Sequence, residues 1–206
     1  AVGAEEYEIN VLSEEQALEL LRRQGRWQQS SLPEQAQKII QECGFLPLAI
    51  SMIGASLKGR PANRWQNVLE RLQNAELQKI RHVFKDYPYP DLFKALHVSV
   101  EVLSPLLQAR YLELAIFPED TPIPESVLEI YWNKEDLQDY DALDIIDELV
   151  DASLLSRYNN KSVTMHDLQR DYLKSQCLNL AQCHRKLIDS YEKAYPDGWH
   201  TIPYEK

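Results

Sequence analysis

The sequence predicts a mainly α-helical protein in which a small helical bundle is followed by a second helical domain with one short β-hairpin. Three observations predict this class. Apolar residues recur at helical spacing through most of the 206-residue chain, and capping residues precede these segments. Apolar and polar residues alternate on both sides of Asn159-Asn160, and asparagine tolerates the positive φ of a hairpin turn. The segment 85–91 contains two prolines and predicts the domain boundary.

Four short amphipathic helices are expected in the first domain, residues 13–84. Ser13 begins the first helix, with a glutamine three positions later that completes a capping box. Pro33 and Pro47 begin the second and third helices, because a proline in the first turn loses no hydrogen bond. Asn63 is expected to cap the fourth helix. The faces expected to be buried comprise Ala17, Leu18, Leu20, Leu21, Ala36, Ile39, Ile40, Cys43, Leu48, Met52, Ala55, Ser56, Trp65, Val68, Leu69 and Leu72.

The second domain, residues 90–175, is expected to contain helices, a short strand and a two-stranded wing, which is the composition of a winged helix. Ser104 and Pro105 supply an N-cap and a first helical residue. Residues 114–120 form an apolar run that is ended by a proline; it is too short for a helix and is predicted to be a strand. Further helices are expected over 91–103, 124–132 and 141–152. Residues 176–206 are expected to begin another helical unit that is truncated.

Composition limits the possible partners. The formal net charge is -10, and an acidic chain repels the phosphates of nucleic acid. Three cysteines without CxxC spacing indicate reduced thiols in a cytoplasmic protein, with neither a disulfide framework nor a metal site. No apolar run has the length of a membrane span and no signal peptide is recognised, so we expect no membrane partner.

A DNA-binding transcription regulator is the alternative function, because many winged helices place their third helix in the major groove. Residues 135–151 occupy the position of that helix and contain neither lysine nor arginine. Their polar side chains are mostly aspartate and glutamate, so contact with phosphates would add repulsion. We therefore expect a solvated acidic face, or a face that contacts a basic surface of the same protein.

Four motifs occur in order along these elements. They are CGFLPLA (43–49) in the bundle, LAIFPED (114–120) and LVDASLL (149–155) in the winged helix, and MHD (165–167) after the wing. Together they resemble the NB-ARC family, the nucleotide-switched ATPases of apoptosis and of plant disease resistance. Segments 32–43 and 165–173 look most like the family's apoptotic member. The resemblance covers residues 7 to 195.

The sequence departs from the family pattern in two respects. It contains no GxxxxGK[ST] phosphate-binding loop, and Phe45 stands where many members carry glycine. The resemblance therefore implies the part of such a protein that follows its nucleotide-binding domain, and residues 7–12 resemble the end of that domain. By itself this part is not expected to be an enzyme.

The function that the resemblance implies is that of regulatory helical and winged-helix modules in an ADP/ATP-dependent signalling switch of apoptosis or innate immunity. These modules would help to clamp ADP in the closed state and would rearrange to permit oligomerisation. ADP or ATP is expected only in the full-length protein, with no cofactor for this chain alone. The implied partners are the missing nucleotide-binding domain and further copies of the parent protein. A scaffold whose switch motifs have decayed is a further alternative.

Pro47 and His166 are the nucleotide-binding residues that the resemblance implies. Pro47 would pack against the adenine ring, and it also suits a helix start. His166 would donate a hydrogen bond to the terminal phosphate of ADP, close to a helix N-terminus that attracts anions; a structural histidine is the alternative. Gly44 and Leu46 are expected to support Pro47, with Gly44 supplying the turn before the helix. Asp167 is expected to cap the helix that follows. No catalytic residue and no metal ligand is expected.

Overall fold

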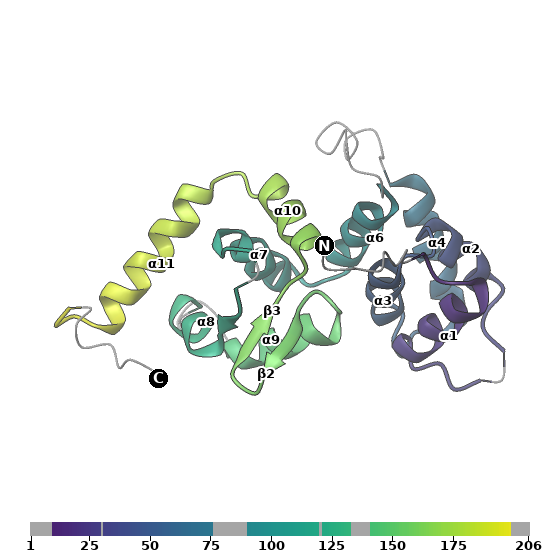
Figure 1. Cartoon of the computed structure of the whole chain (residues 1–206), viewed down its shortest axis with the longest axis horizontal. Helices are drawn as coiled ribbons and strands as arrows, with labels where there is room; N and C mark the ends of the chain where they lie inside the picture. Colours follow the sequence, from purple (N-terminus) through teal and green to yellow (C-terminus); the bar gives the residue numbers. More distant parts are fainter. Residues whose placement is uncertain (1–9, 30, 76–89, 120, 133–140, 199–206) are drawn as a thin grey trace, which may run out of the picture. The chain divides into compact units, whose positions relative to one another are not determined.

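The computed structural model describes residues 10–29, 31–75, 90–119, 121–132 and 141–198, and it divides the chain into two compact units, Ala1–Ser99 and Val100–Lys206 (Figure 1). The first unit contains α1 (Glu14–Gln24), α2 (Gln35–Glu42), α3 (Pro47–Ser56), α4 (Ala62–Asn74) and most of α6 (Pro90–Glu101). The second contains α7 (Pro105–Glu113), the 3₁₀ helix η1 (Leu114–Ile116), β1 (Ile123–Pro124), α8 (Glu125–Tyr131), α9 (Ala142–Asp151), β2 (Ser156–Asn159), β3 (Ser162–Thr164), α10 (Asp167–Gln176) and α11 (Leu180–Ala194). The predicted mainly α-helical class is confirmed.

Helices α1 to α4 form the predicted bundle, in which α1 packs on α3 and α2 packs on α4. The capping box of α1 is present: the Ser13 hydroxyl accepts from the Gln16 N–H, and the Gln16 side chain accepts from the Ser13 N–H. Gly54 allows α3 to lie close to α1, because a Cβ atom there would come within 2.6 Å of the Gln24 Cβ. Trp65 is fully buried and its ring meets the Trp27 ring edge-on at 5.3 Å.

Two local predictions in the bundle were wrong. Helix α4 begins after Pro61, so Asn63 lies inside its first turn and does not cap it. Helix α3 buries Ala49, Ile50, Met52, Ile53 and Gly54, whereas Leu48, Ala55 and Ser56 are half-buried. Because α3 is apolar around most of its circumference, spacing alone could not identify the buried face.

Helix α6 is joined to the helical bundle by a buried cation. The Lys94 side chain is 4% exposed, and its ammonium group lies 2.6 Å from a Glu42 carboxylate oxygen and 3.1 Å from one of Asp91. A charge this deeply buried requires such partners. The two units divide after Ser99, within α6, whereas the sequence predicts that the winged-helix domain begins at residue 90. Most of the predicted linker, 85–89, lies outside the described residues.

The wing is present in the second unit. Strands β1, β3 and β2 form an antiparallel sheet in that order, with Val163 paired to Ile123 on one side and to Arg157 on the other. Strands β2 and β3 are the predicted hairpin around Asn159-Asn160.

The strand predicted over residues 114–120 was wrong. Residues 114–116 continue from α7 as the 3₁₀ helix η1, and the Phe117 N–H bonds back to the Leu114 carbonyl. Leu114 and Ala115 are buried because α10 and α11 pack on this turn. The apolar run therefore reflects burial of a helical turn, and the third strand of the sheet is β1, which lies further along the chain.

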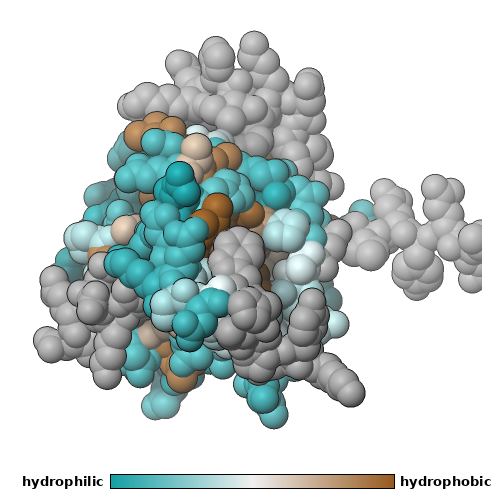
Figure 2. Space-filling view, turned by 90° about the vertical axis from the view of Figure 1, so that its left-hand side faces the viewer, coloured by the Kyte–Doolittle hydropathy of each residue, from teal (hydrophilic) through white to brown (hydrophobic). Residues whose placement is uncertain are grey.

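Helix α11 packs on α8 and η1 but buries none of its residues fully. Figure 2 views the end of the molecule where α11 lies, and its surface is mainly hydrophilic with scattered hydrophobic residues. The second compact unit thus includes the part of residues 176–206 that the structure describes. No helix in the described segments combines the length and the hydropathy needed to cross a membrane.

Candidate functional site

The turn between α2 and α3 is built from two consecutive left-handed residues. Gly44 has φ +59° and Phe45 has φ +56°, and together they reverse the chain so that α3 begins at Pro47. Gly44 thus supplies the turn, as its position in the sequence indicated. Leu46 is extended and stands at the N-cap without a side-chain cap bond. The Pro47 ring is exposed at the first position of the helix.

Phe45 adopts a conformation that costs an ordinary L-residue about 1–2 kcal/mol, because its Cβ crowds the backbone. The conformation is held by backbone hydrogen bonds on both sides of the residue. The Phe45 N–H donates to the Ile40 carbonyl at 3.1 Å, and the Phe45 carbonyl accepts from the Leu12 N–H at 3.1 Å. The turn therefore has the backbone that glycine would adopt, although its second residue is phenylalanine.

Carboxylates and a cation close this turn against α6. A Cβ on Gly44 would lie 3.0 Å from a carboxylate oxygen of Asp91, which is itself bound to Lys94. Burial alone lowers the pKa of Lys94, but its hydrogen bonds to Glu42 and Asp91 outweigh that effect and raise it. Burial raises the pKa of the neighbouring Cys43 thiol far above its ordinary value, so Cys43 is a neutral core residue and not a nucleophile.

His166 is the N-cap of α10. Its Nδ1 accepts from the Leu168 N–H at 3.3 Å, so the proton of the neutral ring is placed on Nε2. The side chain is exposed, and Nε2 is thus left as its hydrogen-bond donor. Asp167 was expected to be the cap, and this was wrong: it is the first residue of α10, because the imidazole already fills the capping position.

A buried glutamine fixes the loop that carries His166. Gln169 is 3% exposed; its Oε1 accepts from the His166 N–H at 3.0 Å and its Nε2 donates to the Ser153 carbonyl at 3.1 Å. Ser153 follows α9 in the left-handed conformation, with φ +58°. One amide thus joins the LVDASLL segment to the MHD segment.

Arg170 connects the LAIFPED segment to the same helix. Its Nε donates to the Phe117 carbonyl at 2.5 Å, and its Nη1 pairs with the Glu119 carboxylate. Three of the four sequence motifs therefore meet at the first turn of α10. Gln169, Arg170 and Lys94 are not among the site residues that the sequence predicted. Of the three, only Gln169 could have been recognised from the sequence, because it stands three residues after the helix cap, at the position of a capping-box glutamine.

The site residues fall into two groups, one in each unit: Gly44, Leu46 and Pro47 in the first, His166 and Asp167 in the second. Each group presents an exposed ring at a helix start, the pyrrolidine of Pro47 and the imidazole of His166. Within the described segments, no cluster of three or more histidine, cysteine, aspartate or glutamate side chains could hold a metal ion. The arrangement is suited to binding and offers no assembled set of catalytic groups among these five residues.

The winged-helix part has a defined family. Residues 107–173 match the family model described as "Apoptotic protease-activating factor 1-like, winged-helix domain". Beyond this segment, the chain is 38% identical over 195 residues to "Apoptotic protease-activating factor 1" of Homo sapiens, an alignment that covers 93% of the chain and 15% of that protein. The same-named protein of Danio rerio is 35% identical over 223 residues, covering 99% of the chain and 17% of the relative.

A plant protein also matches. "Disease resistance protein ADR1" of Arabidopsis thaliana is 28% identical over 213 residues, which cover 94% of the chain and 26% of that protein. The chain thus spans only between 15% and 26% of the length of these three relatives. The matches confirm the resemblance drawn from the motifs: the chain is similar over most of its length to apoptotic protease-activating factors and to a plant disease resistance protein.

Replacing Gly44 with alanine should destabilise the first unit more than the same change at Gly59. Both glycines have positive φ, so each variant pays about 1 kcal/mol or more of backbone strain. Only at Gly44 does the new Cβ meet another group, Asp91, whereas nothing lies within 4 Å at Gly59. We expect roughly 1 kcal/mol of additional loss at Gly44, measured by urea unfolding. Equal losses for the two variants would contradict the close approach to Asp91.

Gln169→Leu should lower the free energy of unfolding by about 1–3 kcal/mol, because the His166 N–H and the Ser153 carbonyl lose their partner in a buried place. Gln176→Leu, on the exposed end of the same helix, is the matched control and should change little. Gln169→Glu keeps an acceptor for His166 but loses the donor to Ser153, so it reports on the second bond. If Gln169→Leu were as stable as Gln176→Leu, the amide would not hold the loop.

Proposed function

We propose that the chain is the regulatory helical and winged-helix part of an ADP/ATP-dependent signalling switch, of the kind named in its relatives for apoptosis and disease resistance. One observation carries the proposal. His166 uses Nδ1 to cap α10, so its exposed imidazole presents Nε2–H as a donor at a helix N-terminus. That is a suitable arrangement for an anionic oxygen, since the helix dipole and the N–H both favour negative charge.

The residues present fit two of the contacts that a nucleoside diphosphate needs. Nε2–H of His166 can donate to the terminal phosphate, and the rigid exposed face of Pro47 can pack against a flat base. ADP would supply the phosphate acceptor and the ring. The chain contains no GxxxxGK[ST] loop, so the phosphate cradle belongs to another part of the full-length protein. Alone, we expect the chain neither to bind nor to hydrolyse ATP.

In this proposal the nucleotide changes the balance between two states. ADP stabilises the closed state through the contact with His166, and exchange for ATP removes that contact and frees the winged-helix unit for oligomerisation. A ligand can shift such a balance only by the difference in its affinity for the two states. The hydrogen bond from His166 is that difference here.

The alternative of DNA binding is disfavoured by the surface of α9. Its buried side is Ala142, Ile145, Ile146 and Leu149, and its exposed residues include Asp144, Asp147, Glu148 and Asp151. Arg157 of the wing is already paired with Glu125 and Asp147. The helix that would face phosphates thus carries carboxylates, and the arginine beside it is neutralised.

In the full-length protein, His166→Asn should release ADP faster and shift the protein toward the open, self-associating state. Asparagine retains an oxygen that caps α10 but lacks a donor at the position of Nε2. A hydrogen bond to a charged group is worth about 1.5–3 kcal/mol, which corresponds to roughly a ten- to hundred-fold change in the closed-to-open ratio. The measurements are ADP release and oligomer size at equal protein concentration.

His184→Ala, at an exposed position of α11, is the control and should behave as the wild type. The histidine would be structural, and the assignment wrong, if His166→Asn kept the wild-type rate of ADP release while its melting temperature fell.

Random double-stranded DNA should not be shifted in a gel by this chain at micromolar concentration and moderate salt. The exposed face of α9 repels phosphates, so no counterion release is available to drive binding. A charge-reversed variant, Asp144→Lys with Glu148→Lys, tests the reason, because it should bind more than the wild type. Salt-dependent binding of the wild-type chain would instead favour the transcription regulator.

A further inference from the structure

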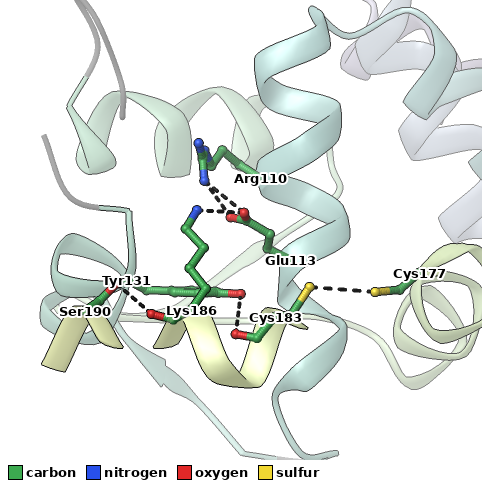
Figure 3. Close-up of polar contacts among 7 residues, drawn as sticks. All are labelled: Arg110, Glu113, Tyr131, Cys177, Cys183, Lys186 and Ser190. Atoms are coloured by element: carbon green, nitrogen blue, oxygen red, sulfur yellow. Dashed lines mark hydrogen bonds and ion pairs between the residues drawn. The ribbon is translucent and has the colours of Figure 1, made fainter. Parts of the chain in front are cut away.

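Two cysteines lie next to each other at the junction between the end of α10 and the start of α11. Cys177 is the C-cap of α10 and Cys183 lies in the first turn of α11, and their sulfur atoms are 3.8 Å apart (Figure 3). Both are free thiols and both are half-buried. The sequence showed only an odd number of cysteines without CxxC spacing; the fold brings two of the three together.

Contacts outside the two cysteines fix their approach. The Cys177 N–H donates to the Leu173 carbonyl at 2.8 Å, which ends α10. The Tyr131 hydroxyl donates to the Cys183 carbonyl at 3.2 Å. One turn further along α11, Lys186 lies 2.7 Å from a Glu113 carboxylate oxygen, and Glu113 also binds Arg110 (Figure 3). These contacts anchor the first two turns of α11 on α7 and α8 and so fix the position of the Cys183 backbone.

We propose that Cys177 and Cys183 form a dithiol site that is oxidised reversibly to a disulfide by exchange with a small-molecule disulfide such as oxidised glutathione. The sulfurs, 3.8 Å apart, need to approach by roughly 2 Å to reach the disulfide bond length of about 2 Å. The dithiol site includes neither His166 nor Pro47.

The exchange balances in two steps. The Cys177 thiolate attacks one sulfur of oxidised glutathione, forms a mixed disulfide and displaces one glutathione thiolate. Cys183 then loses its proton, attacks the Cys177 sulfur and displaces the second glutathione. Two protein thiols are oxidised and one glutathione disulfide is reduced to two thiols, which take up the two protons. Burial, with the hydrogen bond and charge of Cys177, raises the pKa of Cys183 to about 11, so Cys183 is the poorer first nucleophile.

Oxidation would tie the end of α10 covalently to the first turn of α11. These two helices are otherwise joined by the short connection Cys177–Asn179, of which Leu178 is fully exposed. A disulfide across this connection would restrict the angle between α10 and α11. Cys43 provides an internal comparison, because it is fully buried and belongs to the first unit, whereas Cys177 and Cys183 belong to the second.

The test is to incubate the intact protein with oxidised glutathione, block free thiols with a maleimide under denaturing conditions, and digest with trypsin without reduction. Lys174 and Arg185 bracket both cysteines, so they fall in one peptide, 175–185. We expect this peptide to lose both maleimides and two hydrogens, while Cys43 stays fully labelled. Further cleavage after Leu178 or Leu180 should leave pieces that separate only after reduction.

Single variants make the result specific. Cys177→Ser and Cys183→Ser should each abolish the intrapeptide disulfide, and Cys43→Ser should leave its yield unchanged. The proposal is overturned if peptide 175–185 keeps both maleimides at glutathione disulfide concentrations that oxidise an unfolded control, or if the disulfide joins either cysteine to Cys43 or to a second chain.

Discussion

The buried amide of Gln169 is the contact on which the winged-helix part of the candidate site depends. It satisfies one backbone N–H, that of His166, and one backbone carbonyl, that of Ser153. Each of these groups would be costly to leave unpaired away from water. Because the amide holds the backbone of His166 at the start of α10, the imidazole can cap the helix, and the cap in turn places the ring proton on Nε2. The chemistry of the exposed donor therefore follows from a residue that is not exposed.

The first unit solves a similar problem with charge. A left-handed turn, Gly44-Phe45, lies beside the ammonium group of Lys94, which binds the carboxylates of Glu42 and Asp91. In the second unit the left-handed residue is Ser153 and the buried partner is a neutral amide. In the first unit Lys94 binds the carboxylate of Asp91, which approaches Gly44, whereas in the second Gln169 bonds directly to the left-handed residue. The ion pairs of Lys94 carry the cost of removing a cation from water. The first unit therefore depends more strongly on both of its carboxylates than the second unit does on a neutral amide.

Local signals in the sequence predicted the elements well, and contacts between distant segments explain the errors. The cap at Ser13 joins residues three apart, and the hairpin around Asn159-Asn160 pairs residues at most eight apart, so a short sequence pattern can encode both. The strand predicted over residues 114–120 was wrong because apolar character indicates burial and does not indicate conformation. The conformation, a 3₁₀ turn, is set by the packing of α10 and α11. His166 caps α10 in place of Asp167, because an imidazole nitrogen can accept a hydrogen bond from a backbone N–H as a carboxylate does. Pro47 and His166 entered through the family resemblance, which their local patterns alone do not establish.

The residues that position the site could not be obtained from the sequence in the same way. The bond from Gln169 to Ser153 spans 16 residues, and that from Arg170 to Phe117 spans 53. These two bonds have a consequence for any ligand of Nε2. A displacement of the imidazole also disturbs the cap of α10, and through Gln169 and Arg170 it reaches the segments after α9 and after η1. In the proposed switch, a ligand of Nε2 would therefore act on several segments of the winged-helix unit at once.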